Sequence, residues 1–236
     1  MENKRKLGIL YVVATPIGNL KDITLRALDI LKSVDLIACE DTRQTAKLLF
    51  RYGIKKKLIS YFEHNKVKRS QELICYLKEG KKIALVTDSG TPGISDPGFF
   101  ITRLAQEEDI KISPLPGPCA LIAALSGSGL PTDKFVFEGF LPPKEIARRK
   151  RLSLLKEEER TIIFYESTHR LQKTLSDIKD IFGDIDICVA KELTKVYEEI
   201  KIDKASEIIE FFSGQRQKGE FVIIIPKKKR KTVRKI

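Results

Sequence analysis

Glycine, proline, aspartate and hydroxyl side chains are concentrated in one stretch of the sequence, TDSGTPGISDPG at residues 87–98. The apolar run Ile83–Val86 precedes it, which predicts a buried strand that ends in a loop of exposed backbone. Gly90, Gly93 and Gly98 allow positive φ and the close approach of another molecule, while two prolines stiffen the path. Ligands of open α/β sheets bind beyond the carboxyl ends of the strands. We therefore predict that this loop holds a ligand, and the alternative is a rigid surface turn.

Four other polar clusters follow predicted strands, at residues 15–19, 40–43, 166–170 and 191–195. Each could be only the capped start of a helix, since Asp41 and Ser167 have side chains suited to that role. Their common placement directly after predicted strands is the signal. Together they favour a shared cleft over coincidence.

The sequence lacks the short motifs of several common enzyme classes. It contains no GxGxxG fingerprint, no GxxxxGK[ST] phosphate loop and no GxSxG nucleophile elbow. Its only histidines are His64 and His169, and it has no CxxC pair. We therefore expect no hydrolase triad, no metal site and no disulfide framework. The cysteines are expected to pack as small apolar residues in a reducing compartment; they are Cys39, Cys75, Cys119 and Cys188.

The charge of the chain is strongly positive and unevenly placed. The formal net charge is +12, and seven positive charges lie in the tail at residues 227–236. Such a tail attracts polyanions with little sequence preference, so we expect it to bind RNA through Lys227, Lys228, Lys229 and Arg230. The alternative is an end that only improves solubility.

No apolar stretch approaches the ~20 residues that a membrane helix needs. The basic start MENKRKLGIL lacks the long apolar region of a secretory signal. A cytoplasmic protein with no membrane partner is therefore expected.

Strands and helices are predicted to alternate in the first half of the chain. The runs that predict strands are Ile9–Ala14, Asp35–Cys39, Leu58–Tyr61, Ile83–Val86 and Ile110–Ser113. Helices separate them, and we expect Leu25, Leu28 and Leu31 on the inner face of the first helix. This alternation is typical of βαβ units and of a mainly parallel sheet.

A second domain is predicted after Pro116, because prolines and glycines crowd residues 115–120 as they do in domain linkers. Its predicted strands are Phe135–Glu138, Thr161–Tyr165, Ile185–Lys191, Val196–Ile200 and Glu220–Pro226. The third and fourth are too close in sequence for a crossover helix, which predicts an antiparallel or mixed sheet. We therefore expect an α/β fold with two domains, 1–116 and 117–226, followed by the basic tail.

Several motifs occur in the order that is found in one known family. They are VATPIGNL, ACEDTR, VTDSGTPGISDPG, PLPGPCA, FEGFLP, FYES-x-HR, AKELTK and GEFV, and they extend from Leu10 to Pro226. In this combination the chain resembles the tetrapyrrole-methylase superfamily and, within it, the methyltransferases of small-subunit ribosomal RNA. Thr168 departs from the pattern, because the family usually has proline there.

The resemblance implies two α/β domains with S-adenosylmethionine in the cleft between them, and a homodimer. It also implies 2′-O-methylation of a cytidine ribose in the decoding region of 16S rRNA in the small ribosomal subunit. The expectation of no metal comes from the residues themselves, because the loops offer backbone amides and hydroxyls but no cluster of metal ligands. The positions that match cofactor contacts of the family are Pro16, Asp88, Ser89, Gly90, Thr91, Ile94, Cys119, Ala120, Tyr165 and Leu193.

Methyl transfer from a sulfonium requires aligned reacting atoms and the removal of one weakly acidic proton. The candidates for the base are Asp41, Glu40 and Asp96, with Glu166 as a further one. The cations that could hold phosphates are Arg43, Arg170 and Lys191. We expect Glu40 and Asp41 nearest to the chemistry, because their strand should neighbour the one that feeds the loop at residues 87–98.

Two other functions remain open at this point. The same fold could methylate a small tetrapyrrole precursor, for which a few arginines would suffice. Alternatively, the chain could be a non-catalytic RNA-binding assembly factor that only binds the cofactor. The basic tail favours an RNA substrate over a tetrapyrrole.

Overall fold

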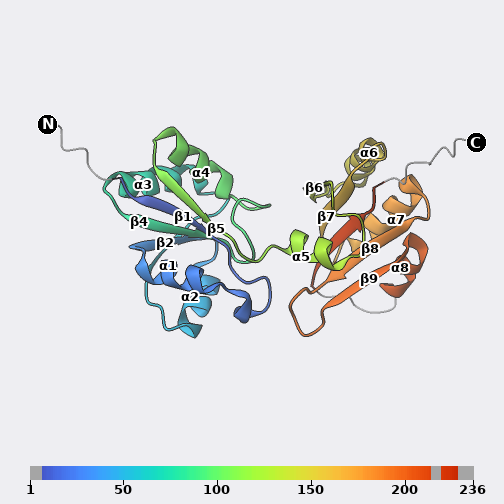
Figure 1. The fold of residues 1–236 in the computed structure, drawn as a ribbon. Coiled ribbons are helices and arrows are strands. Elements are labelled where there is room, and N and C mark those ends of the chain that lie inside the picture. Colours follow the sequence, from blue (N-terminus) through green and yellow to red (C-terminus); the bar gives the residue numbers. More distant parts are fainter. Residues whose placement is uncertain (1–6, 214–218, 228–236) are drawn as a thin grey trace, which may run out of the picture. The chain divides into compact units, whose positions relative to one another are not determined.

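A computed structural model describes residues 7–213 and 219–227 of the chain. The chain divides into two compact units, Met1–Cys119 and Ala120–Ile236, and each unit has its own sheet (Figure 1). Within the described residues, none of the helices has the length and apolar character needed to cross a membrane.

The N-terminal unit is built on a parallel sheet with the strand order β3-β2-β4-β1-β5. Its strands are β1 (Ile9–Val13), β2 (Leu36–Cys39), β3 (Lys57–Ser60), β4 (Lys82–Val86) and β5 (Lys111–Leu115). Every pairing between these strands is parallel, as the sequence predicted. Their carboxyl ends therefore lie at one edge of the sheet.

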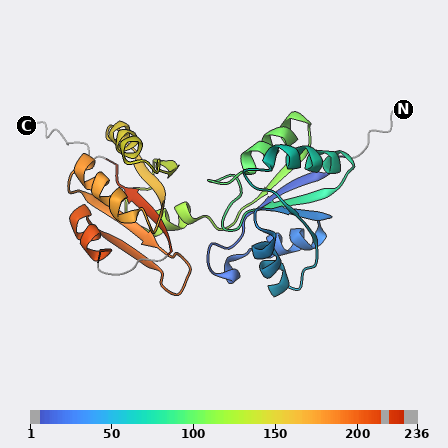
Figure 2. The same ribbon diagram turned by 180° about the vertical axis from the view of Figure 1, so that it is seen from behind.

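Helices cover both faces of this sheet, as Figure 1 and the view from behind in Figure 2 show. They are α1 (Leu25–Ser33), α2 (Thr42–Arg51), α3 (Lys66–Lys78) and α4 (Gly98–Glu107), with a short 3-10 turn η1 (Leu20–Asp22). One apolar core contains residues of α1 and α2, and the other contains residues of α3 and α4. The chain thus leaves the neighbouring strands β1 and β4 toward opposite faces, which is the topology at which open α/β sheets bind their ligands.

The inner face of α1 differs from the prediction. Thr24 caps the helix by accepting a hydrogen bond from Ala27 N at 3.1 Å, and Ala27 and Leu31 are its buried residues. Leu25 is 81% exposed, so its predicted inward position is wrong. Residues two apart on a helix point in directions ~200° apart, so an inward Ala27 turns Leu25 outward.

The C-terminal unit has a mixed sheet with the order β6-β7-β10-β8-β9. Its strands are β6 (Phe135–Phe140), β7 (Thr161–Ser167), β8 (Asp186–Lys191), β9 (Glu199–Lys204) and β10 (Glu220–Ile225). β6 and β7 are parallel, and the other pairs are antiparallel. The predicted mixed sheet is therefore confirmed.

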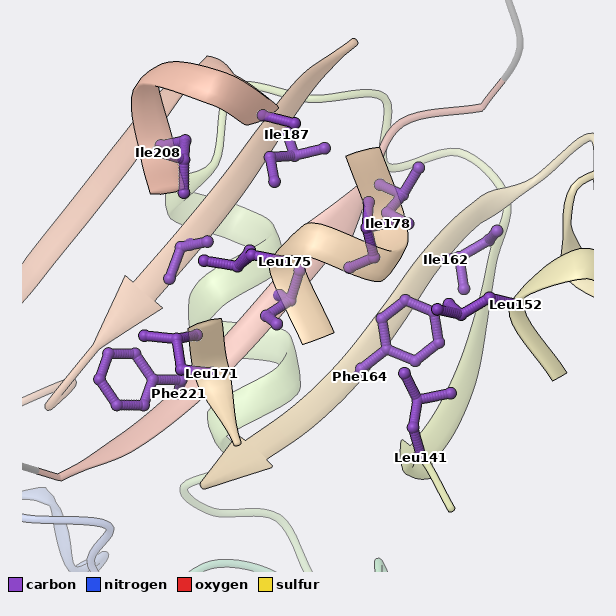
Figure 3. Packing of buried hydrophobic residues seen from close by; sticks show 14 of the residues in the cluster. Leu141, Leu152, Ile162, Phe164, Leu171, Leu175, Ile178, Ile187, Ile208 and Phe221 are labelled. Atoms are coloured by element: carbon purple, nitrogen blue, oxygen red, sulfur yellow. The ribbon is translucent and has the colours of Figure 1, made fainter. Parts of the chain in front are cut away.

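The helices of this unit are α5 (Ala120–Gly127), α6 (Glu145–Leu155), α7 (Leu171–Phe182) and α8 (Ala205–Phe211). One core joins α6, α7 and α8 to the sheet. Figure 3 shows Leu171, Leu175 and Ile178 of α7 in this core, together with Phe164 and Phe221 of the strands. Helices α6 and α8 were not predicted from the sequence, and α7 was considered only as a helix start that Ser167 could cap.

Strand β9 begins later than predicted. The expected strand Val196–Ile200 includes a turn in which Val196 is 92% and Tyr197 is 78% exposed. Glu192 and Thr194 have positive φ in the same turn, which ends the extended chain of β8. The apolar residues that suggested a strand therefore lie on the surface of a loop.

The described cysteines are all free, but they do not share one environment. Cys39 and Cys188 are buried, and burial raises the pKa of each thiol to about 11. Cys119 is partly buried. The expectation that every cysteine packs inside is wrong for Cys75, which is exposed on α3.

Candidate ligand site at the strand ends of the N-terminal unit

The loops that follow β1 and β4 are joined to each other at the carboxyl edge of the sheet. Thr15 N donates to Gly90 O at 2.8 Å, and Gly90 N donates to Thr15 O at 3.1 Å. The buried hydroxyl of Thr15 donates to Thr87 O at 3.0 Å. The loop at residues 87–98 is therefore held in place by buried hydrogen bonds of the sheet edge.

The end of β2 is joined to the same loop. Thr87 Oγ1 donates to Glu40 Oε2 at 3.0 Å, and Asp41 N donates to Asp88 Oδ1 at 3.0 Å. The structure thus brings together the polar residues after β1, β2 and β4, which the sequence predicted to face one cleft.

The backbone of the loop has the special conformations that its glycines suggested. Gly90 and Gly93 have φ of +87° and +89°. At Gly98 the absence of a side chain is needed for space, because an added Cβ atom would lie 2.7 Å from Gly93 N. A Cβ atom on Gly90 would lie 3.5 Å from Ile17 Cγ2 and 3.9 Å from the carbonyl oxygen of Pro118. Gly90 is therefore buried, with its backbone between two flanking segments.

The segment at residues 116–119 is fixed beside this loop within the N-terminal unit. Thr91 Oγ1 donates to Pro118 O at 3.0 Å. Loops that follow β1, β4 and β5 therefore form one hydrogen-bonded rim. Sequence reasoning did not single out Thr15 or Thr87 as structural members of this rim, although each directly follows a β-branched apolar run.

Asp41 has the contacts of a capping residue. Its Oδ1 accepts from Arg43 N at 2.8 Å, and its Oδ2 accepts from the Arg43 guanidinium at 2.7 Å. Hydrogen bonds from the Arg43 side chain and backbone lower the pKa of Asp41 to about 2. The carboxylate is thus held in its ionised form as the N-cap of α2. Its catalytic role stays a prediction.

The pKa of Asp96 is shifted in the opposite direction from that of Asp41. Burial, followed by the nearby charge of Glu40, raises the pKa of Asp96 to about 6, although a hydrogen bond with Thr87 opposes the rise. Thr87 therefore lies between two carboxyl groups. A pocket of about 10 Å³ adjoins them, lined by Glu40, Tyr61, Leu85, Val86, Thr87, Pro92, Asp96, Pro97 and Gly98. Its size is close to that of one water molecule.

The carboxylates at this edge create a negatively charged site. Burial and the charges of Glu40 and Asp41 raise the pKa of Asp88, although the N–H of Asp41 stabilises its ionised form. Among the residues that the structure describes, no group of three or more His, Cys, Asp or Glu side chains is arranged to hold a metal ion. The arrangement suits a cationic organic ligand that is bound by exposed backbone and carboxylates.

Glu166 and Arg170 belong to a buried network in the C-terminal unit. Glu166 is 1% exposed, and its Oε2 accepts from Thr174 Oγ1 at 2.7 Å. The Arg170 guanidinium forms an ion pair with Glu166 at 3.2 Å and donates to Leu141 O at 2.5 Å. These contacts connect β7, α7 and the segment after β6, which indicates a structural role. Their roles as base and phosphate ligand stay predictions.

The remaining predicted residues of this unit lie at strand ends. Tyr165 of β7 accepts a hydrogen bond from Leu121 N at 3.2 Å through its hydroxyl. Leu193 is buried in the turn after β8, and Lys191 ends that strand. Of the predicted RNA-binding tail, Lys227 forms an ion pair with Asp133 at 2.6 Å. Lys228, Lys229 and Arg230 lie outside the described residues.

Comparison with known proteins gives one family. The family model of the tetrapyrrole (corrin/porphyrin) methylases matches residues 9–209. A relative from Escherichia coli O157:H7, named ribosomal RNA small subunit methyltransferase I, is 49% identical over 92% of this chain and 77% of its own length. Relatives of the same name from Synechocystis sp. and Thermotoga maritima are 51% and 48% identical over 93% of this chain, and 79% and 98% of their own lengths.

Solved structures share the fold. A diphthine synthase has a TM-score of 0.72 at 13% identity, over 92% of this chain and 89% of its own. A uroporphyrin-III-C-methyltransferase from Thermus thermophilus has a TM-score of 0.59 at 16% identity, over 92% of this chain and 91% of its own. At these identities the likeness concerns the fold alone.

Proposed function

Because this chain belongs to the tetrapyrrole (corrin/porphyrin) methylase family, we propose that it transfers a methyl group from S-adenosylmethionine to the 2′-oxygen of a cytidine ribose in 16S rRNA. The observation that carries this proposal is the 48 to 51% identity to relatives named ribosomal RNA small subunit methyltransferase I over 92 to 93% of the chain. Action on the decoding region of the small subunit is part of the proposal. A homodimer and a cytoplasmic location stay predictions.

The strand-end site fits the proposed cofactor. Gly90 is buried with a positive φ, and a side chain there would project between Ile17 and Pro118. The carboxylate of Asp88 suits a ligand with positive charges on its sulfur and amino groups. We assign the cofactor contacts of this unit to Pro16, Asp88, Ser89, Gly90, Thr91 and Ile94. Contacts from Cys119, Ala120, Tyr165 and Leu193 stay predictions.

When bound, S-adenosylmethionine supplies an already activated methyl group. The residues of the chain must then orient the ribose hydroxyl and accept its proton. Asp96 suits the second task best, because its pKa of about 6 makes it a stronger base than Asp41 and leaves it ionised above neutral pH. Thr87 fixes Glu40 beside it through the 3.0 Å hydrogen bond. We therefore place Asp96 first among the carboxylates that the sequence indicated.

Cofactor binding is expected to need no metal, because the site offers backbone groups, hydroxyls and spaced carboxylates. Isothermal titration calorimetry of the purified protein with S-adenosylmethionine should give the same Kd with and without EDTA. A large loss of affinity in EDTA that added Mg²⁺ or Zn²⁺ restores would contradict this expectation.

Mass spectrometry of the RNA tests the proposed activity. Small ribosomal subunits that lack the modification are incubated with the protein and S-adenosylmethionine, and the nuclease fragments of their RNA are weighed. We expect one additional methyl group on a cytidine ribose. Methylation of an added tetrapyrrole precursor but not of RNA would overturn the proposal. Binding of RNA and cofactor without any transfer would support an assembly factor instead.

A further inference from the structure

A cluster of aromatic rings lies at the end of β6 in the C-terminal unit. The ring of Tyr165 meets the ring of Phe137 at a centroid distance of 4.8 Å and that of Phe140 at 5.7 Å. The interplanar angles are 67° and 63°, which are edge-to-face arrangements. Phe140 is 54% exposed, so one side of the cluster faces solvent.

An irregularity in the strand places Phe140 in this cluster. Phe137 pairs with Ile163 and Phe140 pairs with Tyr165, so three steps along β6 correspond to two along β7. Gly139 lies in this step with a φ of +63°, a conformation that favours glycine. In regular pairing Gly139 would stand opposite Tyr165, and Phe140 would point to the other face of the sheet. The bulge therefore directs an apolar ring toward the same side as Tyr165.

Tyr165 provides a rigid support for the exposed ring. Its hydroxyl accepts the hydrogen bond from Leu121 N in the first turn of α5, and its ring is in contact with Phe137. Single exposed apolar residues are common and need no explanation. Phe140 differs from them because a special backbone conformation and a fixed second ring determine its position.

Cations lie in the segment and the helix that follow Phe140. Lys144 is exposed in the segment that leads from β6 into α6. Arg151 of α6 forms an ion pair with Glu138 at 2.6 Å, which holds the basic helix α6 beside the end of β6. An exposed ring next to cations is the combination that proteins use to bind single-stranded RNA.

We propose that Phe140, supported by Tyr165, stacks against an unpaired base of the substrate RNA. This inference rests on the proposed function, because a ribose inside a duplex must be made accessible before its 2′-oxygen can be aligned with a methyl donor. Unpaired RNA bases are commonly held by stacking on aromatic side chains. An aromatic platform retains such a nucleotide without reading its sequence.

The proposal is tested by two substitutions of Phe140, one that keeps the aromatic ring and one that keeps only an apolar side chain. Phe140→Leu keeps an apolar side chain but removes the ring, and we expect the KM for small subunits to rise by about 5- to 150-fold. Phe140→Tyr keeps the ring and should restore a near-normal KM. Both variants should bind S-adenosylmethionine as the unaltered protein does.

Phe211 offers a matched control in the same unit. It is 46% exposed and lies edge-to-face with Phe212 at a centroid distance of 5.0 Å, but on α8. Phe211→Leu should leave the KM for small subunits unchanged. An equal rise of KM in the Phe211 and Phe140 variants would show a general effect of surface aromatics and overturn the assignment.

A direct optical test is available because the chain contains no tryptophan. Phe140→Trp would create a single tryptophan whose fluorescence is quenched when a base stacks on it. We expect quenching on addition of an RNA oligonucleotide that carries the target region, and no quenching in Phe211→Trp. This measurement needs no methyl transfer, so it separates the failure of this inference from the failure of the proposed function.

Two further results would overturn the inference. An unquenched Phe140→Trp together with a normal KM for Phe140→Leu would show that the ring does not meet the RNA. A weaker affinity for S-adenosylmethionine in Phe140→Leu, with RNA binding unchanged, would assign the ring to the adenine of the cofactor.

Discussion

Asp96→Asn is expected to lower the rate of methyl transfer by about 10²- to 10⁴-fold, the usual contribution of a general base. Asn has the same size and can still contact Thr87, but it cannot accept the proton of the ribose hydroxyl. The measurement is the initial rate of methyl incorporation into small subunits at saturating S-adenosylmethionine. Cofactor affinity, measured separately by calorimetry, should change little.

The pH profile provides a second readout for Asp96. Its pKa is raised to about 6, so the carboxylate becomes available as a base as the pH rises through this value. We expect kcat/KM to increase between about pH 5 and pH 7 and then to level off. In Asp96→Asn this rise of kcat/KM with pH should disappear.

Stability should change in the opposite direction to activity. A carboxyl group whose folded pKa is raised stabilises the fold below its unfolded pKa, and this contribution is lost as the pH rises through the folded pKa. For Asp96 the loss occurs between about pH 4 and pH 6. Asn resembles the neutral form, so Asp96→Asn should melt at the same temperature as the unaltered protein or higher at pH 8. An inactive variant with a lower melting temperature would not support a role as base.

Asp41→Asn and Glu40→Gln are the matched controls at the same strand edge. Asn caps helices about as well as Asp, so the N-cap of α2 should survive in Asp41→Asn. We expect this variant to retain most of its activity. A large loss of activity in Asp41→Asn, with Asp96→Asn nearly normal, would reverse the assignment and restore Asp41 as the first candidate.

Gly90→Val is expected to abolish measurable binding of S-adenosylmethionine. Valine is strained at a φ of +87°, at a cost of about 1–3 kcal/mol, and its Cβ would enter the space between Ile17 and Pro118. Both effects displace the loop that is joined to Thr15 by paired backbone hydrogen bonds. Calorimetry with the cofactor and thermal melting of the same samples would measure the two consequences.

Gly53→Val is the control that separates the effect of backbone strain from the effect of a damaged cofactor site. Gly53 also has a positive φ, +64°, but it lies in the turn between α2 and β3, where no atom is within 4 Å of an added Cβ. Its valine variant should lose stability but retain cofactor affinity. Equal affinities in the Gly90 and Gly53 variants would identify the loop at residues 87–98 as a structural turn only.

The strands and the site-bearing loops of the N-terminal unit were predictable from local sequence. Buried parallel strands are continuous apolar runs, and Gly-Pro-Asp segments end them, so β1, β2 and β4 were recognised with their loops. Helices α6 and α8 were not predicted, and α7 was considered only as a helix start near Ser167. Before β9 the exposed Val196 and Tyr197 misled the prediction, because apolar character by itself does not distinguish a strand from a turn.

The sequence by itself determined the family, the two α/β units and the position of the glycine-rich loop, since these depend on motifs and on the period of apolar residues. The tertiary structure decided which carboxylate is held as a cap and which has a raised pKa. Asp41 and Asp96 are the same residue type, and each lies within a polar loop. Their different pKa values arise because Arg43 pairs with one, while burial and Glu40 act on the other. Burial and charge proximity are set by contacts between strands that are distant in sequence, and no local pattern records them.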